Sequence, residues 1–557
     1  MSINAKYQWS TAPKTTDVKS LLRVLYQARD ISTNAGVKAF LHPDITTIHS
    51  PWELHDMKPA VERIKLAIEK HEQITVYGDY DADGITSTSL LSEVLVRLGA
   101  NVNYYVPDRF RDGYGPNQKA YDWLIQNGTQ LVVTVDNGVS GKDVIDHAVD
   151  CGIDVVITDH HQIPAELPTK ACAIVHPGFP KTKYPFAGLS GVGVAFKLAW
   201  ALLGEIPIDE LDLVAIGEIA DVVPVNDENR LLISMGLKQI EQTKRPGLRE
   251  LLELAHLTGR KLSSTEVGFD IAPRLNSLGR IGNPSQGVAM LTSFDSRQAE
   301  NIACSAENLN QKRKKLVQDI YQEAIKPAEN NQANALIVAG KTWHQGVLGI
   351  VASRILEETG KPTVVISGNG LMKGSGRSRE GFDLYRALDP HRDLLVAFGG
   401  HPQACGLSVE SREIAPLQEA FAYEAGQQGF SANMRPKLVV DAEVDPRVVS
   451  SVKAYEILHK LQPYGPGNRQ PELLIKNVLP TNFFEMGTEG QHLKFMVDGL
   501  TCVDFNVPGL KEQINGQRVD IVGKLNLNIW RNTKTVQLLV DEVGGQAVLG
   551  RQGSLTT

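Results

Sequence analysis

Three carboxylates lie close together early in the chain. Asp79, Asp81 and Asp83 occur in the segment GDYDADG, directly after the apolar run 74–77. Residues two apart in an extended or turning segment face the same way, so we expect these side chains to converge. Neighbouring anions repel one another unless a cation lies among them, and manganese or magnesium is the usual partner of oxygen ligands. A calcium loop would need a glutamate where Leu90 stands, whereas a solvated acidic turn remains an alternative.

Further polar residues follow two more predicted strands. The run 130–135 ends at Asp136, and the run 154–158 ends in Asp159, His160 and His161. Strand and helix patterns alternate with short connections, which predicts a parallel sheet whose ligand site lies beyond the carboxyl ends of its strands. We therefore expect Asp136, His160 and His161 to meet Asp81 and Asp83 at one edge of a sheet.

A fifth carboxylate follows a more ambiguous segment. LDLVAIGEIADVVPV, residues 211–225, begins with a helical pattern and carries Asp221 before a Val-Val-Pro break. On its own, Asp221 is better explained as an ordinary carboxylate at a helix end or turn.

Together these segments resemble a known superfamily. GDYDADG, VTVDNG, ITDHH and GEIADVVP are similar, in this order, to the four motifs of the DHH phosphoesterases, and most of the chain resembles the RecJ family within them. The resemblance implies that two divalent cations, Mn²⁺ or Mg²⁺, are held by Asp81, Asp83, Asp136, His160 and Asp221, with Asp136 bridging. It leaves Asp79 as a ligand or as an orienting neighbour. Two cations about 3.5–4 Å apart lower the pKa of a bridging water and clamp a phosphodiester, and His161 is assigned to the scissile phosphate or the leaving oxygen.

Basic and polar segments supply candidate substrate contacts. The loop DRFRDGYGP carries Arg109 and Tyr114, and the resemblance favours Arg109 in a pocket for the 5′ phosphate, whereas Arg111 fits a solvated loop better. FDIAPRLNSLGRIGN, residues 269–283, is a polar, glycine-broken segment that resembles part of the DNA track of the RecJ family. From it the resemblance carries over Arg274, Asn276 and Arg280.

A long helix is predicted over 296–328. It contains a basic run with Gln311 and Arg313, which is either a solvated helix face or a floor for the nucleic-acid backbone. AGLSGVGVAFKL, within 179–198, fails the spacing of a phosphate-binding P-loop and is interpreted as tight packing of a helix against the sheet.

The second half of the chain divides into two further regions. WHQGVLGIVASRI, GSGRS and FGGHPQACG resemble the DHH-associated domain, which implies Ser375 and Arg377 as 5′-phosphate contacts and His401 as a substrate-side residue. Short strand-like runs between 436 and 543 predict a small all-β barrel, similar to the OB-fold domain of the RecJ family. Tyr464, Phe495 and Trp530 are candidate base-stacking residues, although core burial is the alternative for each.

The expected fold is therefore α/β. A parallel-sheet DHH domain is joined by a long helix to a second α/β domain, and an all-β OB-fold domain follows. The expected division is a helical lead-in at 1–70, the DHH catalytic domain at 71–290, a connecting helix at 291–330, the DHH-associated substrate-binding domain at 331–430 and the OB fold at 431–557.

The composition bears on the cellular compartment, the state of the cysteines and the presence of membrane spans. The chain of 557 residues has a net charge of −7, five scattered cysteines without a CxxC pair, and no apolar run long enough to cross a bilayer. We expect a cytoplasmic protein with reduced thiols and no zinc.

The resemblance implies a metal-dependent exonuclease that degrades single-stranded DNA in the 5′→3′ direction to 5′ mononucleotides, in DNA repair and recombination. It also implies a monomer that works with a single-strand-binding protein and a RecQ-type helicase, away from membranes. One alternative is a DHH phosphodiesterase for very short RNAs or cyclic dinucleotides, but such enzymes generally lack the barrel. A second is a soluble pyrophosphatase, which is far shorter. A third is a non-enzymatic replication scaffold, which would have lost carboxylates.

Overall fold

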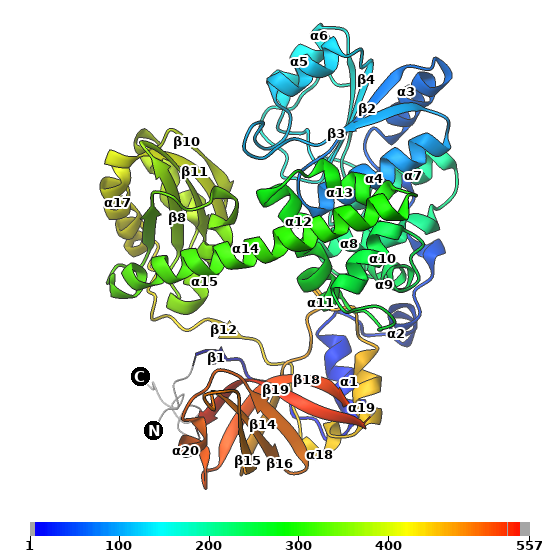
Figure 1. The fold of residues 1–557 in the computed structure, drawn as a ribbon. Coiled ribbons are helices and arrows are strands. Elements are labelled where there is room, and N and C mark those ends of the chain that lie inside the picture. Colours follow the sequence, from blue (N-terminus) through cyan, green and yellow to red (C-terminus); the bar gives the residue numbers. More distant parts are fainter. Residues whose placement is uncertain (1–5, 532, 546–557) are drawn as a thin grey trace, which may run out of the picture. The chain divides into compact units, whose positions relative to one another are not determined.

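A computed structural model describes residues 6–531 and 533–545, and these fall into two compact units (Figure 1). One unit spans residues 45–433. The other combines the described residues of 1–44 with those from 434 onward. The predicted lead-in at 1–70 is therefore divided between the two units, because its first part packs with the C-terminal region.

The unit of residues 45–433 begins with a five-stranded, fully parallel sheet in the order β3-β2-β4-β5-β6. The strands are β2 (Gln73–Tyr77), β3 (Asn101–Tyr105), β4 (Leu131–Val135), β5 (Asp154–Thr158) and β6 (Ala173–Val175). All five residues of the central strand β4 are buried, as is typical of parallel sheets covered on both faces. The parallel sheet predicted from the alternating pattern is confirmed.

Side chains that alternate along the strands face two separate hydrophobic cores. Leu131 and Val133 pack in the larger core with helices α3, α4, α7 and α8, whereas Val132 packs in a smaller one with α5 and α6. The helices of this region are α3 (Met57–Glu69), α4 (Ala82–Arg97), α5 (Gln118–Gln126), α6 (Lys142–Asp150), α7 (Gly191–Leu203), α8 (Leu211–Ala220), α9 (Asp227–Glu241), α10 (Pro246–Leu254), α11 (Ser264–Glu266), α12 (Ala272–Ile281) and α13 (Ser285–Thr292).

The segment interpreted as a polar, glycine-broken stretch is mostly helical. A π-helical turn at Val267–Ile271 leads directly into α12, whose first turn contains Pro273. Proline is tolerated there because the first helical N–H groups have no intrahelical partner.

A 35-residue helix, α14 (Ser296–Asn330), leads from these helices to the second α/β region, in agreement with the predicted long helix (Figure 1). This region has a mixed sheet in the order β10-β11-β9-β8-β7, in which only β7 and β8 pair in parallel. Its elements are β7 (Leu336–Gly340), α15 (Leu348–Thr359), β8 (Thr363–Asn369), β9 (Leu371–Arg377), α16 (Leu384–Leu388), β10 (Ala397–His401), β11 (Ala404–Glu410) and α17 (Ile414–Gln427).

The second unit is built on a seven-stranded sheet in the order β13-β14-β18-β19-β17-β16-β15. Its elements are β1 (Gln8–Trp9), α1 (Val18–Gln27), α2 (Asn34–Leu41), β12 (Lys437–Leu438), β13 (Ala442–Glu443), α18 (Pro446–Val449), α19 (Val452–His459), β14 (Leu473–Val478), β15 (Thr481–Met486), β16 (His492–Val497), β17 (Leu500–Asp504), α20 (Leu510–Ile514), β18 (Val519–Trp530) and β19 (Thr533–Gly545). The N-terminal segment joins this unit through β1, which pairs with β12, and through Leu21 and Leu25 of α1, which are buried in its core.

No helix among the described residues combines the length and the apolar character needed to cross a bilayer.

Candidate metal centre

The residues predicted as metal ligands meet at the carboxyl edge of the parallel sheet. Their donor atoms form overlapping sets, and within each set all atoms lie within 4.8 Å of one another. The sets are Asp79, Asp81 and Asp136; Asp83, His160 and Asp221; and Asp136, His160 and His161. Asp136 and His160 each belong to two sets, so neighbouring ions could share ligands at this position.

The GDYDADG segment reaches the site by a different geometry from the one expected. Helix α4 begins at Ala82, four residues earlier than predicted, so Asp81 is its N-cap and Asp83 lies in its first turn. The Asp81 carboxylate accepts a hydrogen bond from the Gly84 N–H at 3.0 Å. The three carboxylates therefore converge through a strand-to-helix turn, and the argument from two-residue alternation is wrong.

Gly84 is needed for this turn. A Cβ added to it would lie 2.5 Å from the Asp79 carbonyl oxygen, so the chain can fold back tightly only where that side chain is missing.

Asp83 is held by the start of helix α7. It accepts hydrogen bonds from the Gly191 N–H at 2.7 Å, the Val192 N–H at 2.9 Å and the Ser190 hydroxyl at 3.2 Å. The first N–H groups of a helix favour a negative charge, so α7 positions this carboxylate. The glycine-rich segment thus packs tightly as a helix against the site.

Asp136 follows β4 with a left-handed backbone, φ 61°, and the residue is 2% exposed. Its Oδ1 lies 3.1 Å from His160 Nε2, which is also 3.9 Å from Asp83 Oδ2 and 3.6 Å from Asp221 Oδ2. A non-glycine residue in this conformation is strained, and such strain tends to occur at functional sites.

The buried carboxyl groups of the site repel one another, and this shifts their pKa values upward. Burial, together with repulsion from Asp81, raises the pKa of Asp83 to about 7. Burial and repulsion from Asp83 raise the pKa of Asp221 to about 8, and the same two causes hold the pKa of Asp136 well above its usual range. Burial lowers the pKa of His160 to about 3, so its imidazole is neutral and has a nitrogen lone pair available for a metal ion.

The donor set fits divalent cations that prefer oxygen. Asp79 Oδ1 is buried and has no hydrogen-bond partner among the described residues, so an acceptor atom is available inside the cluster. Five carboxylates with one or two imidazoles suit manganese or magnesium better than zinc.

His161 is oriented by a residue that sequence reasoning did not select. Its Nδ1 lies 2.8 Å from Asp159 Oδ1, and its Nε2 lies 2.9 Å from the Tyr114 hydroxyl. Burial lowers the pKa of His161, but the hydrogen bond with Asp159 and the charges of Asp159, Asp221 and Asp79 together raise it to about 9. The same contact lowers the pKa of Asp159 to about 2 against the effect of its own burial. Asp159 directly precedes the two histidines, and that position was the available signal.

Four of the predicted arginines form a cationic group in this unit. Burial, together with the nearby charges of Arg109, Arg313 and Arg377, lowers the pKa of Arg280 to about 10, while the charge of Asp81 acts in the opposite direction. Arg280 also donates to the Gly346 carbonyl at 3.3 Å, which joins α12 to the segment before α15.

Two candidate phosphate contacts lie together on β9. The Arg377 guanidinium donates to the Ser375 hydroxyl at 3.1 Å, and both side chains are half-buried. The exposed residue His401 ends the neighbouring strand β10.

Other predicted substrate contacts have structural partners. Arg274 is 6% exposed and pairs with Glu307 of α14 at 2.6 Å, so this guanidinium is largely closed to solvent. Asn276 accepts a hydrogen bond from the Ala82 N–H at 2.9 Å and thereby fixes the start of α4. Gln311 is exposed and donates to Glu307. Arg111 is a solvent-exposed loop residue beside Asp108, as the sequence predicted.

The three candidate stacking residues differ in burial. Phe495 is fully buried, Tyr464 is half-buried with its hydroxyl donating to the Leu458 carbonyl, and Trp530 is 68% exposed. Trp530 is thus the one of the three that presents its ring to solvent, with the Arg531 guanidinium 5.7 Å from the ring centroid.

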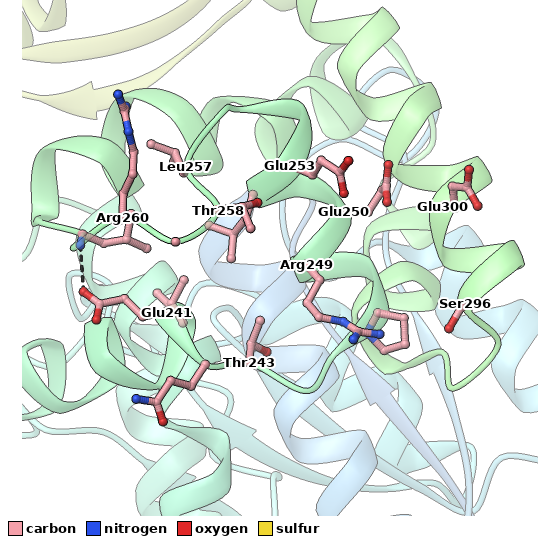
Figure 2. A pocket seen from close by; sticks show the side chains of 16 residues that line it. Glu241, Thr243, Arg249, Glu250, Glu253, Leu257, Thr258, Arg260, Ser296 and Glu300 are labelled. Atoms are coloured by element: carbon pink, nitrogen blue, oxygen red, sulfur yellow. Dashed lines mark hydrogen bonds between the residues drawn. The ribbon is translucent and has the colours of Figure 1, made fainter. Parts of the chain in front are cut away.

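A separate pocket of about 420 Å³ lies among α9, α10 and the start of α14 (Figure 2). Glu250, Glu253 and Glu300 line it beside Arg249, and none of the predicted site residues takes part. Repulsion among its carboxylates adds to burial in raising the pKa of Glu250.

Comparison with known proteins gives matches to three family models. Residues 73–218 match the DHH family N-terminal domain, 332–426 the DHHA1 domain and 440–542 the RecJ OB domain. The single-stranded-DNA-specific exonuclease RecJ of Bacillus subtilis is 39% identical over 558 residues, covering 97% of this chain and 71% of that protein.

Two solved structures are also similar. The crystal structure of RecJ from Thermus thermophilus in complex with Mn²⁺ aligns with a TM-score of 0.85 and 26% identity, covering 97% of this chain and 80% of that one. The Mg²⁺ complex from the same organism gives 0.78 and 26%, covering 97% and 78%. The order of the domains and the fold expected from the sequence are thereby confirmed, and the donor set agrees with metals bound by these relatives.

Proposed function

The chain belongs to the RecJ family of single-stranded-DNA-specific exonucleases, and from this premise we propose that it removes 5′ mononucleotides from the 5′ end of a strand. It is a hydrolase with a DHH phosphoesterase domain. The direction, a mechanism with two cations and a role in repair and recombination are the proposed elements.

One observation carries the mechanism: donor sets that share Asp136 and His160 at one sheet edge. We assign Asp79, Asp81, Asp83, Asp136, His160 and Asp221 as the residues that hold two divalent cations. Such a pair supplies an activated bridging water and charge neutralisation for in-line attack on a phosphodiester.

The remaining polar groups of the pocket act on the substrate. His161, held by Asp159 and Tyr114, is positioned to donate a hydrogen bond or a proton to the scissile phosphate or the leaving oxygen. The hydrogen bond with Asp159 and the charge of its carboxylate favour the protonated imidazole, which suits a donor.

The proposed direction of degradation, from the 5′ end, depends on the cationic group formed by the four arginines. Guanidinium groups bind phosphate oxygens with two parallel hydrogen bonds. Arg377 and Ser375 on β9 form a binding site for a terminal 5′ phosphate. Arg109 and Arg280 belong to the same cationic group, because the charge of Arg109 helps to lower the pKa of both Arg280 and Arg377. The basic residues around Arg313 of α14, with Gln311 and His401, are proposed contacts for the strand.

The alternative substrates are less compatible with the chain. Phosphodiesterases of very short RNAs or cyclic dinucleotides need no additional binding domain, whereas residues 440–542 match an OB domain, a fold that binds single strands by stacking and a basic groove. A non-catalytic scaffold would not need to retain the complete donor set found here.

Several further properties remain proposals. We propose a cytoplasmic monomer, divided as expected from the sequence apart from its lead-in, that works with a single-strand-binding protein and a RecQ-type helicase. Their support is the DNA substrate of the family: a single strand must be exposed before this enzyme can act on it.

The decisive experiment is a digest of oligonucleotides labelled at either the 5′ or the 3′ end, with Mn²⁺, Mg²⁺ or a chelator. The proposal expects immediate release of 5′-labelled mononucleotide and gradual shortening of 3′-labelled strands. Initial release of the 3′ label would overturn the polarity, and undiminished cleavage after removal of all cations would overturn the metal mechanism.

A further inference from the structure

Glu218 is a fully buried carboxyl group beside the metal centre, and the mechanism above does not use it. It lies on α8, three residues before Asp221, and is 0% exposed. Its Oε1 accepts a hydrogen bond from the Ser190 N–H at 3.3 Å, and its Oε2 has no hydrogen-bond partner among the described residues. Burying a carboxyl group with so few partners costs free energy, so this position calls for an explanation.

Ser190, the N-cap of α7, connects Glu218 to Asp83. Its N–H points to Glu218, while its hydroxyl and the next two N–H groups point to Asp83. Two carboxyl groups from different helices therefore share the donors at one helix start. The hydrogen bond from the Ser190 N–H to Glu218 therefore also positions the Ser190 hydroxyl, which donates to Asp83.

The three helices approach so closely that two positions leave no room for a side chain. A Cβ on Gly193 of α7 would lie 2.2 Å from Glu218 Oε1, and a Cβ on Gly217 of α8 would lie 2.5 Å from Asp83 Oδ1. This close packing means that a small shift of α8 changes the separation between Asp83 and Asp221, which both lie within 3.9 Å of His160 Nε2.

We propose that Glu218 is a positioning residue for the metal centre, which ties the end of α8 that supplies Asp221 to the start of α7 that holds Asp83. The inference rests on the metal site assigned under the proposed function. Partners that orient metal ligands typically contribute 10–100-fold to metal affinity. Glu218 belongs to none of the donor sets, so it acts through Ser190 and not as a ligand.

The test measures Mn²⁺ binding directly. Chelator-treated full-length protein is titrated with Mn²⁺ by isothermal calorimetry, and the unfolding temperature is recorded with and without Mn²⁺. Glu218→Ala should weaken Mn²⁺ binding about 10–100-fold. Glu218→Gln keeps the acceptor oxygen for Ser190 and should stay within about threefold of the parent.

The chain offers a matched control at the opposite end of the same helix. Glu210 is also a buried carboxyl group, but it accepts a hydrogen bond from Arg245 at 2.5 Å and lies outside the donor sets. Glu210→Gln should lower the unfolding temperature without changing Mn²⁺ affinity.

A second variant covers the possibility that Glu218→Ala does not fold. Gly193→Ala places a methyl group against Glu218 Oε1 while favouring the helix, so it should also weaken Mn²⁺ binding. Parental affinity in both Glu218→Ala and Gly193→Ala would overturn the proposal, as would an equal loss in Glu218→Gln and Glu218→Ala. Because binding is read without DNA, a parent that binds Mn²⁺ but fails to cleave would refute the proposed function and leave this inference standing.

Discussion

The metal centre and the barrel present their functional side chains in opposite ways. In the centre, Asp79 and Asp136 are each 2% exposed and are brought in by the ends of parallel strands. In the barrel, Phe495 is fully buried while Trp530, on another strand of the same sheet, is 68% exposed. A strand end in a parallel sheet directs a polar residue to one edge, whereas in a barrel strand the alternation of faces decides whether an aromatic ring is core or surface.

The largest expected effect comes from removing a buried ligand of the metal centre. Asp136→Ala removes a carboxylate that belongs to two donor sets, so cleavage should fall by about 10³-fold or more, the equivalent of about 4 kcal/mol. The check is release of label from a 5′-labelled oligonucleotide in Mn²⁺, with binding followed by fluorescence anisotropy. Binding should remain largely intact, and near-normal turnover would contradict the assignment of the cations.

A second variant tests the phosphate seat on β9. Arg377→Ala removes a charged contact worth about 2–3 kcal/mol, so cleavage of 5′-phosphorylated ends should fall about 30–140-fold. Strands with a 5′ hydroxyl should be affected much less. Arg412→Ala, an 82% exposed arginine of the same region, serves as the control and should change neither rate. An equal loss on both substrates would remove the argument for polarity.

The exposed side of the comparison is tested at Trp530. If its ring stacks on a base, Trp530→Ala should weaken the binding of a long single strand by about 1–3 kcal/mol while cleavage of saturating substrate changes little. Trp52, which is 53% exposed in the other unit, is the matched control, and Trp52→Ala should leave affinity unchanged. Parental affinity in Trp530→Ala would assign strand binding to other residues.

The last prediction concerns a buried carboxyl group outside the metal donor sets. Burial raises the pKa of Asp504, on β17 of the barrel, to about 6. The folded state therefore holds a proton that the unfolded chain has released, so the contribution of this group to stability is present below about pH 4 and is lost as the pH rises through 6.

Asp504→Asn should remove this pH dependence. It should stabilise the barrel by about 2 kcal/mol at pH 7.5 and by little at pH 4, as measured by denaturant unfolding at both values. The same shift at both pH values would mean that hydrogen bonding, and not ionisation, governs this position.

Much of the metal site could be predicted from the sequence because each motif follows a short apolar strand. Strand pairing in parallel then brings Asp79, Asp136 and His160 to one edge without further information. The early start of α4 could not be predicted, since the capping contact between Asp81 and Gly84 competes with an extended turn that the same residues would also permit.

Long-range partners were also beyond sequence reasoning. Glu218 and Asp159 gain their roles from Ser190 and His161, which they meet only after packing. The pairing of β1 with β12 likewise joins segments that no local pattern connects.

That pairing has a consequence for the newly made protein. Trp9 donates a hydrogen bond to Glu542 at 2.5 Å, a partner 533 positions later. At about 5–20 residues per second, a ribosome needs roughly half a minute to two minutes to reach it. The opening residues must therefore wait without their native neighbours while the whole catalytic region is completed first. Deleting β1 would therefore remove part of the unit that is completed last, and would leave the unit of residues 45–433, which follows it in the chain, unchanged.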